Sequence, residues 1–215
     1  MHDDGTAQRP AHYALRAVTA ADLPLARNAR FDLLLCGGLT DTDGGVSSSC
    51  SLVRDDGRVI VVDPGMAADD DAILDPLRVL GVEPRDVADV ILGHHHPDHT
   101  LRAGLFVNAS VHDHWATYRG TTWEDADAEG RELTSSVKLW RTPGHTAEDI
   151  ATVIGSAEGI LVLTHLWWNA QGPAVDPVAE DPEAIHASRA RVLAVADLIV
   201  PGHGAPFRPD AGTPR

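Results

Sequence analysis

The chain has 215 residues, of which 43% are hydrophobic and 23% are charged. These proportions allow a buried core and exclude a collagen, a long coiled coil and a wholly disordered chain. Lys and Arg number 17 against 32 Asp and Glu, so the net charge is -15, which disfavours long nucleic acid and anionic membranes as partners.

The sequence also indicates where in the cell the protein is expected. No apolar run approaches the roughly 20 residues that a membrane-spanning helix needs. The segment Met1 to Arg9 is polar and has no apolar stretch of the kind found in a secretory signal. Cys36 and Cys50 are too few for a disulfide framework, and their apolar surroundings predict core thiols. We therefore expect a cytoplasmic protein.

In the first half of the chain, short strands surround one helix. Residues 1–29 lack periodicity and are expected to form a tail and a lead-in to a single domain over residues 30–215. Apolar spacing over 69–80, followed by Gly81, predicts a helix and its end. Apolar runs predict strands over 31–36, 49–54, 59–62 and 87–92, with a hairpin turn at Asp55-Asp56-Gly57.

The second half repeats this rhythm. Residues 115–132 are polar and irregular, and we expect them to form a surface insertion. Asp181-Pro182 predicts the start of a helix that runs to about residue 196. Further strands are predicted over 105–107, 110–112, 137–141, 150–154, 160–164 and 198–200. Clusters of strands separated by single helices predict an α/β sandwich with two similar halves.

Histidines gather where the predicted strands end. The strand over 87–92 is followed by His94-His95-His96-Pro97-Asp98-His99, and three later strands are followed by His145, His165 and His203. Any one of these side chains could be a solvated loop histidine, but four strand ends that each deliver histidine indicate a shared site. Imidazole nitrogens with a carboxylate oxygen form a donor set that suits Zn²⁺ best.

These motifs resemble those of the metallo-β-lactamase superfamily. The resemblance rests on His94-x-His96-x-Asp98-His99, on His145 in a Thr-Pro-Gly-His run, and on His203 in a Gly-His-Gly run. It covers about residues 31–208, and residues 180–208 look most similar to the small subgroup typified by metallo-β-lactamase domain-containing protein 1. Membership implies an αββα four-layer sandwich of mixed sheets that holds metal in loops at one edge.

The resemblance also implies roles for individual residues. His94, His96 and His145 match the ligands of a first metal ion, and Asp98, His99 and His203 match those of a second ion. Asp63 matches an aspartate of the family near the sheet edge and is expected to orient ligands. His95, which lies between ligands, is expected to have another role.

His165 departs from the family pattern. At this position the family usually has an Asp that bridges both ions, whereas one neutral imidazole cannot bind two ions about 3.5–4 Å apart. Three outcomes stay open: a single ion held by His94, His96 and His145, two ions with His165 on the second, or a shift of metal preference toward Fe or Mn. The first outcome includes the case in which His165 turns away from the site.

The implied function is that of a metal-dependent hydrolase. It would use a zinc-activated water on a small ester, thioester, lactone or amide, with one or two Zn²⁺ ions as cofactor. Asp98 would be a ligand or a general base, and His165 a ligand or a proton donor. The alternatives are a phosphodiesterase or ribonuclease, an iron-bound redox protein, and a non-catalytic metal-binding relative. A small-molecule substrate is expected, and the oligomeric state stays open.

Overall fold

The computed structural model describes residues 23–40 and 44–215. The predicted lead-in is only partly covered: residues 23–28 form no helix or strand, and the start of that segment lies outside the described residues. Within the described residues, no helix has both the length and the apolar character needed to cross a membrane.

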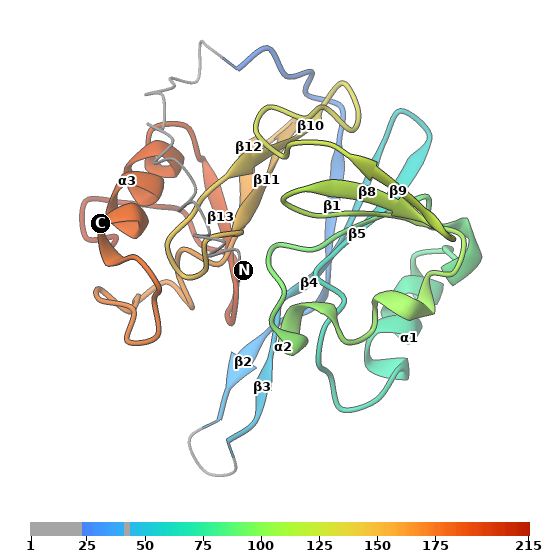
Figure 1. Ribbon diagram of the computed structural model, residues 1–215, viewed down its shortest axis with the longest axis horizontal. Coiled ribbons are helices and arrows are strands. Elements are labelled where there is room, and N and C mark those ends of the chain that lie inside the picture. Colours follow the sequence, from blue (N-terminus) through green and yellow to red (C-terminus); the bar gives the residue numbers. More distant parts are fainter. Residues whose placement is uncertain (1–22, 41–43) are drawn as a thin grey trace, which may run out of the picture.

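Two mixed β-sheets form the centre of the molecule (Figure 1). The first sheet has the order β1-β4-β5-β6-β7-β8-β9. Its strands are β1 (Arg30–Leu35), β4 (Cys50–Asp55), β5 (Arg58–Val62), β6 (Asp89–Ile91), β7 (Ser110–His112), β8 (Ala116–Arg119) and β9 (Thr122–Asp125). The second sheet is formed, in order, by β10 (Val137–Arg141), β11 (Ile150–Ser156), β12 (Gly159–Thr164) and β13 (Leu198–Pro201).

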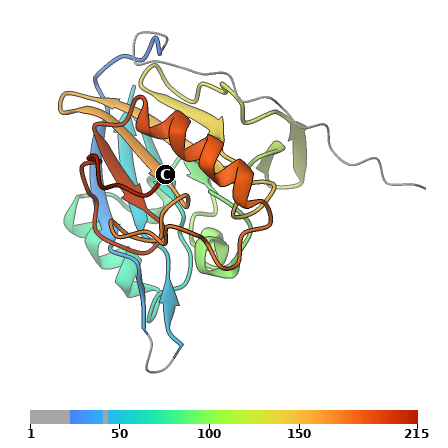
Figure 2. The same cartoon turned by 90° about the vertical axis from the view of Figure 1, so that its left-hand side faces the viewer.

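One long helix covers the outer face of each sheet. On the first sheet, α1 (Asp71–Val79) packs Ile73 and Leu77 against a core that includes Val61. On the second, α3 (Pro182–Leu193) packs Val192 against a core that includes Ile199. Figures 1 and 2 show these two helices on opposite sides of the molecule with both sheets between them.

A third core fills the space between the two sheets. It contains residues from both, among them Ile60 and Val62 of β5 and Leu161 and Leu163 of β12. Val61, between Ile60 and Val62, faces α1 instead, because successive side chains of a strand point to opposite faces. The layers are therefore helix, sheet, sheet and helix, and the expected αββα sandwich is confirmed.

Short elements complete the chain. The strands β2 (Gly38–Leu39) and β3 (Val46–Ser47) pair with each other and project below the two sheets in both views. A single helical turn, α2 (Pro97–Thr100), follows β6, and 3₁₀ turns lie at Pro84–Asp86 and Ala103–Leu105.

The turn between β4 and β5 agrees with the prediction. Asp56 and Gly57 have φ values of 50° and 74°, and two consecutive positive values match a type I′ hairpin turn. The strands pair in the corresponding antiparallel register, with Asp55 opposite Arg58. Helix α3 likewise begins as predicted, because the Asp181 carboxylate accepts hydrogen bonds from the backbone N–H groups of Glu183 and Ala184.

Two predicted elements are wrong. The strand expected over 105–107 is absent: Leu105 ends a 3₁₀ turn, Phe106 alone is buried, and Val107 is 81% exposed. The insertion expected over 115–132 contains a hairpin, β8 and β9, that extends the first sheet at its edge. All of β9 is exposed, so its residues lack the apolar alternation by which a half-buried strand is recognised.

The strand directions bring the histidine loops together. β5, β6 and β7 are parallel, so their carboxyl ends share one edge of the first sheet. β12 and β13 are parallel, and β10 runs in the same direction because both β10 and β12 are antiparallel to β11. The loops that follow β6, β10, β12 and β13 therefore meet at one edge of the sandwich.

Candidate metal centre

The histidine cluster forms where the two sheets meet at this edge. His94, His96 and His99 come from the loop after β6 and from α2, and His145, His165 and His203 follow β10, β12 and β13. All the predicted site residues come together here, in overlapping groups whose potential ligand atoms lie within 4.8 Å of one another. The groups are His94, His96 and His145; Asp98, His99 and His203; His94, His99 and His165; and His145, His165 and Asp176.

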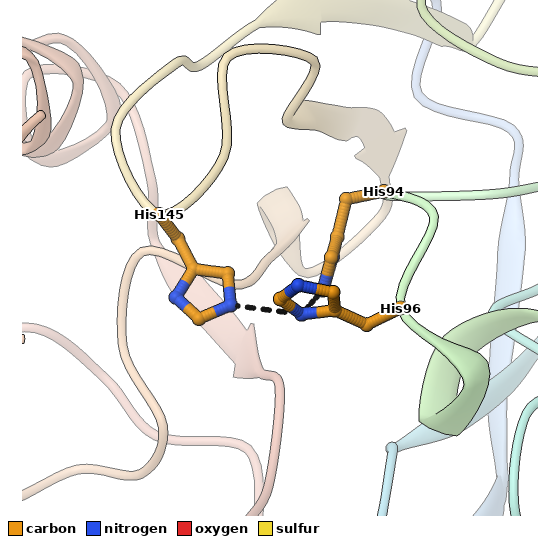
Figure 3. Close-up of side chains that lie close together, drawn as sticks. All are labelled: His94, His96 and His145. Carbon is orange, nitrogen blue, oxygen red and sulfur yellow. Dashed lines mark hydrogen bonds between the residues drawn. The ribbon is translucent and has the colours of Figure 1, made fainter. Parts of the chain in front are cut away.

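The first group places three ring nitrogens face to face (Figure 3). The Nδ1 atom of His96 lies 3.0 Å from Nε2 of His94 and 3.2 Å from Nε2 of His145. Zn–N bonds of 2.0–2.1 Å in a tetrahedral site place ligand nitrogens about 3.3 Å apart. The spacing of this group therefore fits an ion of that size.

The second group centres on Asp98. Its Oδ2 atom lies 3.4 Å from Nε2 of His99 and 3.6 Å from Nε2 of His203. The Nε2 atom of His99 is buried and has no hydrogen-bond partner among the described residues. A buried ring nitrogen without a partner is costly unless a ligand occupies it.

Hydrogen bonds on the outer side of the cluster fix which nitrogen of three rings carries the proton. The outer Nδ1 atoms of His99, His145 and His203 lie 2.8–3.0 Å from the Asp63 carboxylate, the Asp176 carboxylate and the Ser47 carbonyl, respectively. An ionised carboxylate and a carbonyl can only accept, so each Nδ1 donates. In the neutral form of each ring, the inner Nε2 therefore presents a lone pair.

Three rings of the cluster, His94, His165 and His203, favour the neutral form. Burial and the neighbouring histidines lower the pKa of His94 and of His165 well below the usual range. Burial also lowers the pKa of His203. Neutral nitrogens whose lone pairs face one another at such distances repel unless a cation or a proton lies between them. The residues present therefore fit a divalent metal ion.

The pKa values of His145 and of nearby Asp149 are raised instead. Burial opposes the protonation of His145, but its hydrogen bond to Asp176 and nearby carboxylates outweigh burial and raise the pKa. Burial raises the pKa of Asp149 to about 7. Its Oδ1 atom lies 3.7 Å from Nδ1 of His94, too far for a hydrogen bond, and accepts one from the Thr146 hydroxyl.

His165 lies deep in the cluster. It is 7% exposed, and its Nε2 atom lies 2.9 Å from Nε2 of His203. Its Nδ1 atom is buried without a hydrogen-bond partner among the described residues. A Cβ atom at Gly202 would lie 2.5 Å from the His165 ring, so glycine is required beside it. The structure thus does not turn His165 away from the cluster.

Asp63 supports the cluster from the first sheet. Its carboxylate accepts hydrogen bonds from Nδ1 of His99 and, at 2.6 Å, from the backbone N–H of Gly93. Its φ of 52° is uncommon for a residue other than glycine, and such strain is characteristic of functional sites. At Gly65, two residues later, a Cβ atom would lie only 1.6 Å from the Asp98 carbonyl oxygen.

Three further residues complete the surroundings. His95 contacts Asp113 at 3.1 Å, and its ring packs on that of Trp115. Asp149 and Asp176 were not singled out in the sequence. Asp149 could have been found from its place directly before β11, in the loop that carries His145, whereas Asp176 lies in a loop with no periodic pattern.

The family model of the metallo-beta-lactamase superfamily matches residues 43–211. The chain belongs to this superfamily. Metallo-beta-lactamase domain-containing protein 1 of Xenopus laevis is 34% identical over 80% of this chain and 75% of its own length. The human protein of the same name is 37% identical over 69% of this chain and 59% of its own length. The chain thus spans about three fifths of the human relative.

Solved structures show the same fold. A metallo-beta-lactamase family protein from Thermus thermophilus has a TM-score of 0.59 and 19% identity, and the match covers 83% of this chain and 74% of that one. The B. thuringiensis protein AiiA, solved as a mutant with N-decanoyl-L-homoserine at its active site, has a TM-score of 0.63 and 20% identity over 83% of this chain and 94% of that one.

Proposed function

We propose that the protein is a zinc-dependent hydrolase of small esters, thioesters, lactones or amides. One observation carries the proposal. In His99, His145 and His203 the outer Nδ1 atom donates a hydrogen bond to an acceptor of the protein, which leaves the inner Nε2 atom of each ring to bind a metal ion. Superfamily membership agrees with this reading, since the family match spans most of the chain.

The residues would divide into two ion positions. His94, His96 and His145 would hold the first ion, and Asp98, His99 and His203 the second, with His165 as a further ligand beside His203. A bound zinc ion supplies a Lewis acid and lowers the pKa of water. The group of His94, His96 and His145 matches the donor set of known catalytic zinc sites by itself, whether or not a second ion is bound.

Asp98 is the residue best placed to move a proton. Its side chain is 14% exposed, whereas His99 beside it is 1% exposed, so the carboxylate borders both solvent and the cluster. Among the described residues, no hydrogen bond occupies the carboxylate oxygens of Asp98. It can therefore accept a proton from an attacking water and return it to the leaving group.

A small substrate with little charge fits the surroundings best. Lys138 is the only lysine of the chain, and it lies on β10 in an ion pair with Glu132. Trp168 is half-buried, with its ring 6.4 Å from that of His203, and offers an apolar wall. We place this activity in the cytoplasm, with neither long nucleic acid nor a membrane as partner.

The test combines metal content with a substrate panel. Protein purified without a tag or chelator is analysed by mass spectrometry for metal per chain, then assayed on aryl esters, thioesters, acyl lactones and bis(p-nitrophenyl) phosphate. The proposal expects one or two zinc ions and cleavage of a carbonyl substrate, both lost in His96→Ala. Cleavage of the phosphodiester alone, bound iron, or bound zinc without any cleavage would each overturn it.

A further inference from the structure

We infer that Asp176 is a positioning residue that fixes the metal-binding form of His145 and supplies negative charge behind it. This inference rests on the proposed metal site, since it concerns one of the ligands of that site. Asp176 comes from the loop between β12 and α3, outside the motifs that identify the family in the sequence.

The contacts of Asp176 require an ionised carboxylate. Its Oδ2 atom accepts hydrogen bonds from Nδ1 of His145 at 2.8 Å and from Nε1 of Trp168 at 3.3 Å. Its Oδ1 atom accepts one from the backbone N–H of Val178 at 3.0 Å. Both oxygens thus face donors, so an Asn in this place would set its amide against at least one of them.

The burial of this carboxylate calls for a positive charge on or next to His145. The Asp176 side chain is 2% exposed, and its ion-pair partner is His145 at 2.8 Å. A buried carboxylate is costly unless a positive charge balances it. A proton or a metal ion on Nε2 of His145 can supply this charge, and the His96 nitrogen 3.2 Å from that atom is placed to share a metal ion with it. A carboxylate behind a ligating histidine also raises the basicity of that ligand.

Arg189 holds the loop that carries Asp176. This side chain of α3 is fully buried, and it donates to the carbonyls of Leu166, Pro173 and Ala174 at 2.8–2.9 Å. These carbonyls lie at both ends of the segment that precedes Asp176. The guanidinium group therefore holds this loop against α3, and Asp176 follows directly in the part of the chain that contacts His145.

The experiment measures zinc affinity in the full-length protein by competition with a chromophoric chelator. Asp176→Ala and Asp176→Asn are compared with Asp181→Asn, which removes the same charge five residues away. Asn caps a helix as well as Asp does, so the fold of the control is preserved. We expect both Asp176 variants to bind zinc about 10–100-fold more weakly, and the control to match the wild type within about twofold.

A second measurement separates positioning from general damage. In a ¹⁵N–¹H spectrum of the metal-free protein at alkaline pH, where the ring is neutral, His145 should show a protonated Nδ1 and an unprotonated Nε2. This signature should be lost in Asp176→Ala but not in Asp181→Asn. Unchanged affinity and an unchanged His145 signature in the Asp176 variants would overturn the inference. If the wild type binds no zinc, the proposed function fails instead, while the signature still tests the contact.

Discussion

Replacing His165 by Asp should strengthen metal binding at the second position. His165 is 7% exposed and its pKa is lowered well below the usual range by burial, so it is neutral. The substitution therefore adds a full negative charge beside His203, whose Nε2 atom lies 2.9 Å from that of His165. The variant His165→Asn serves as the control, because Asn has the same shape as Asp but carries no charge.

The expected size follows from two opposing terms. A carboxylate about 4 Å from a divalent ion gains about 8 kcal/mol at an effective dielectric constant of about 20. The loss of hydration of a buried carboxylate cancels several kcal/mol of this gain. A remainder of about 1.5–3 kcal/mol corresponds to roughly 10–100-fold tighter binding of the second ion.

Calorimetric titration of the metal-free protein with zinc, together with metal content per chain, measures this effect. The wild type, His165→Asp and His165→Asn are compared at one pH and one salt concentration. Only the Asp variant should gain affinity, and its content should approach two ions per chain. Equal affinity in the Asp and Asn variants would refute the reasoning, because shape rather than charge would then govern the second position.

Three other substitutions test separate parts of the structure. His96→Ala removes the nitrogen that lies 3.0 and 3.2 Å from its two partners, and zinc affinity at the first position should fall by roughly 100-fold or more, as competition titration would show. Arg189→Ala leaves three carbonyls without their donor, and each buried carbonyl without a partner costs about 1–3 kcal/mol. Urea denaturation should therefore show a free energy of unfolding lower by about 3–5 kcal/mol. A decrease below about 1 kcal/mol would contradict the assigned role. Burial opposes ionisation of Asp113, but hydrogen bonds from His95 and Tyr118 outweigh it and lower the pKa to about 2. Because the folded-state value lies below the unfolded value of about 3.9, this stabilisation is present above pH 4 and is lost as the pH falls toward 2. The difference in unfolding free energy between wild type and Asp113→Asn should shrink over that range, and a constant difference would show that the charge is not responsible.

The parts of the fold that the sequence predicted share a physical cause. Buried strands such as β5 are continuous apolar runs, and Asp56-Gly57 provides the positive φ values that a tight hairpin needs. The hairpin of β8 and β9 escaped prediction because β9 is exposed along its whole length and carries Glu124 and Asp125. A strand at a solvated edge buries nothing, so hydrophobic periodicity carries no information about it.

In the candidate site, likewise, some residues could be predicted from the sequence pattern and others depend on the tertiary structure. The inner residues follow strand ends, and parallel strands bring those ends to one edge, so their convergence was predictable from His94 to His203. The groups behind them have no such marker. Asp176 contacts His145 from a loop that Arg189 holds against α3, and each of the three lies on a different segment. Spacing along the chain thus reveals which side chains face the ion, whereas the hydrogen bonds that set their protonation state emerge only from the packed structure. For this reason the charge balance of the site, with His165 inside and Asp176 behind, follows from the packing of the loops and not from the motifs alone.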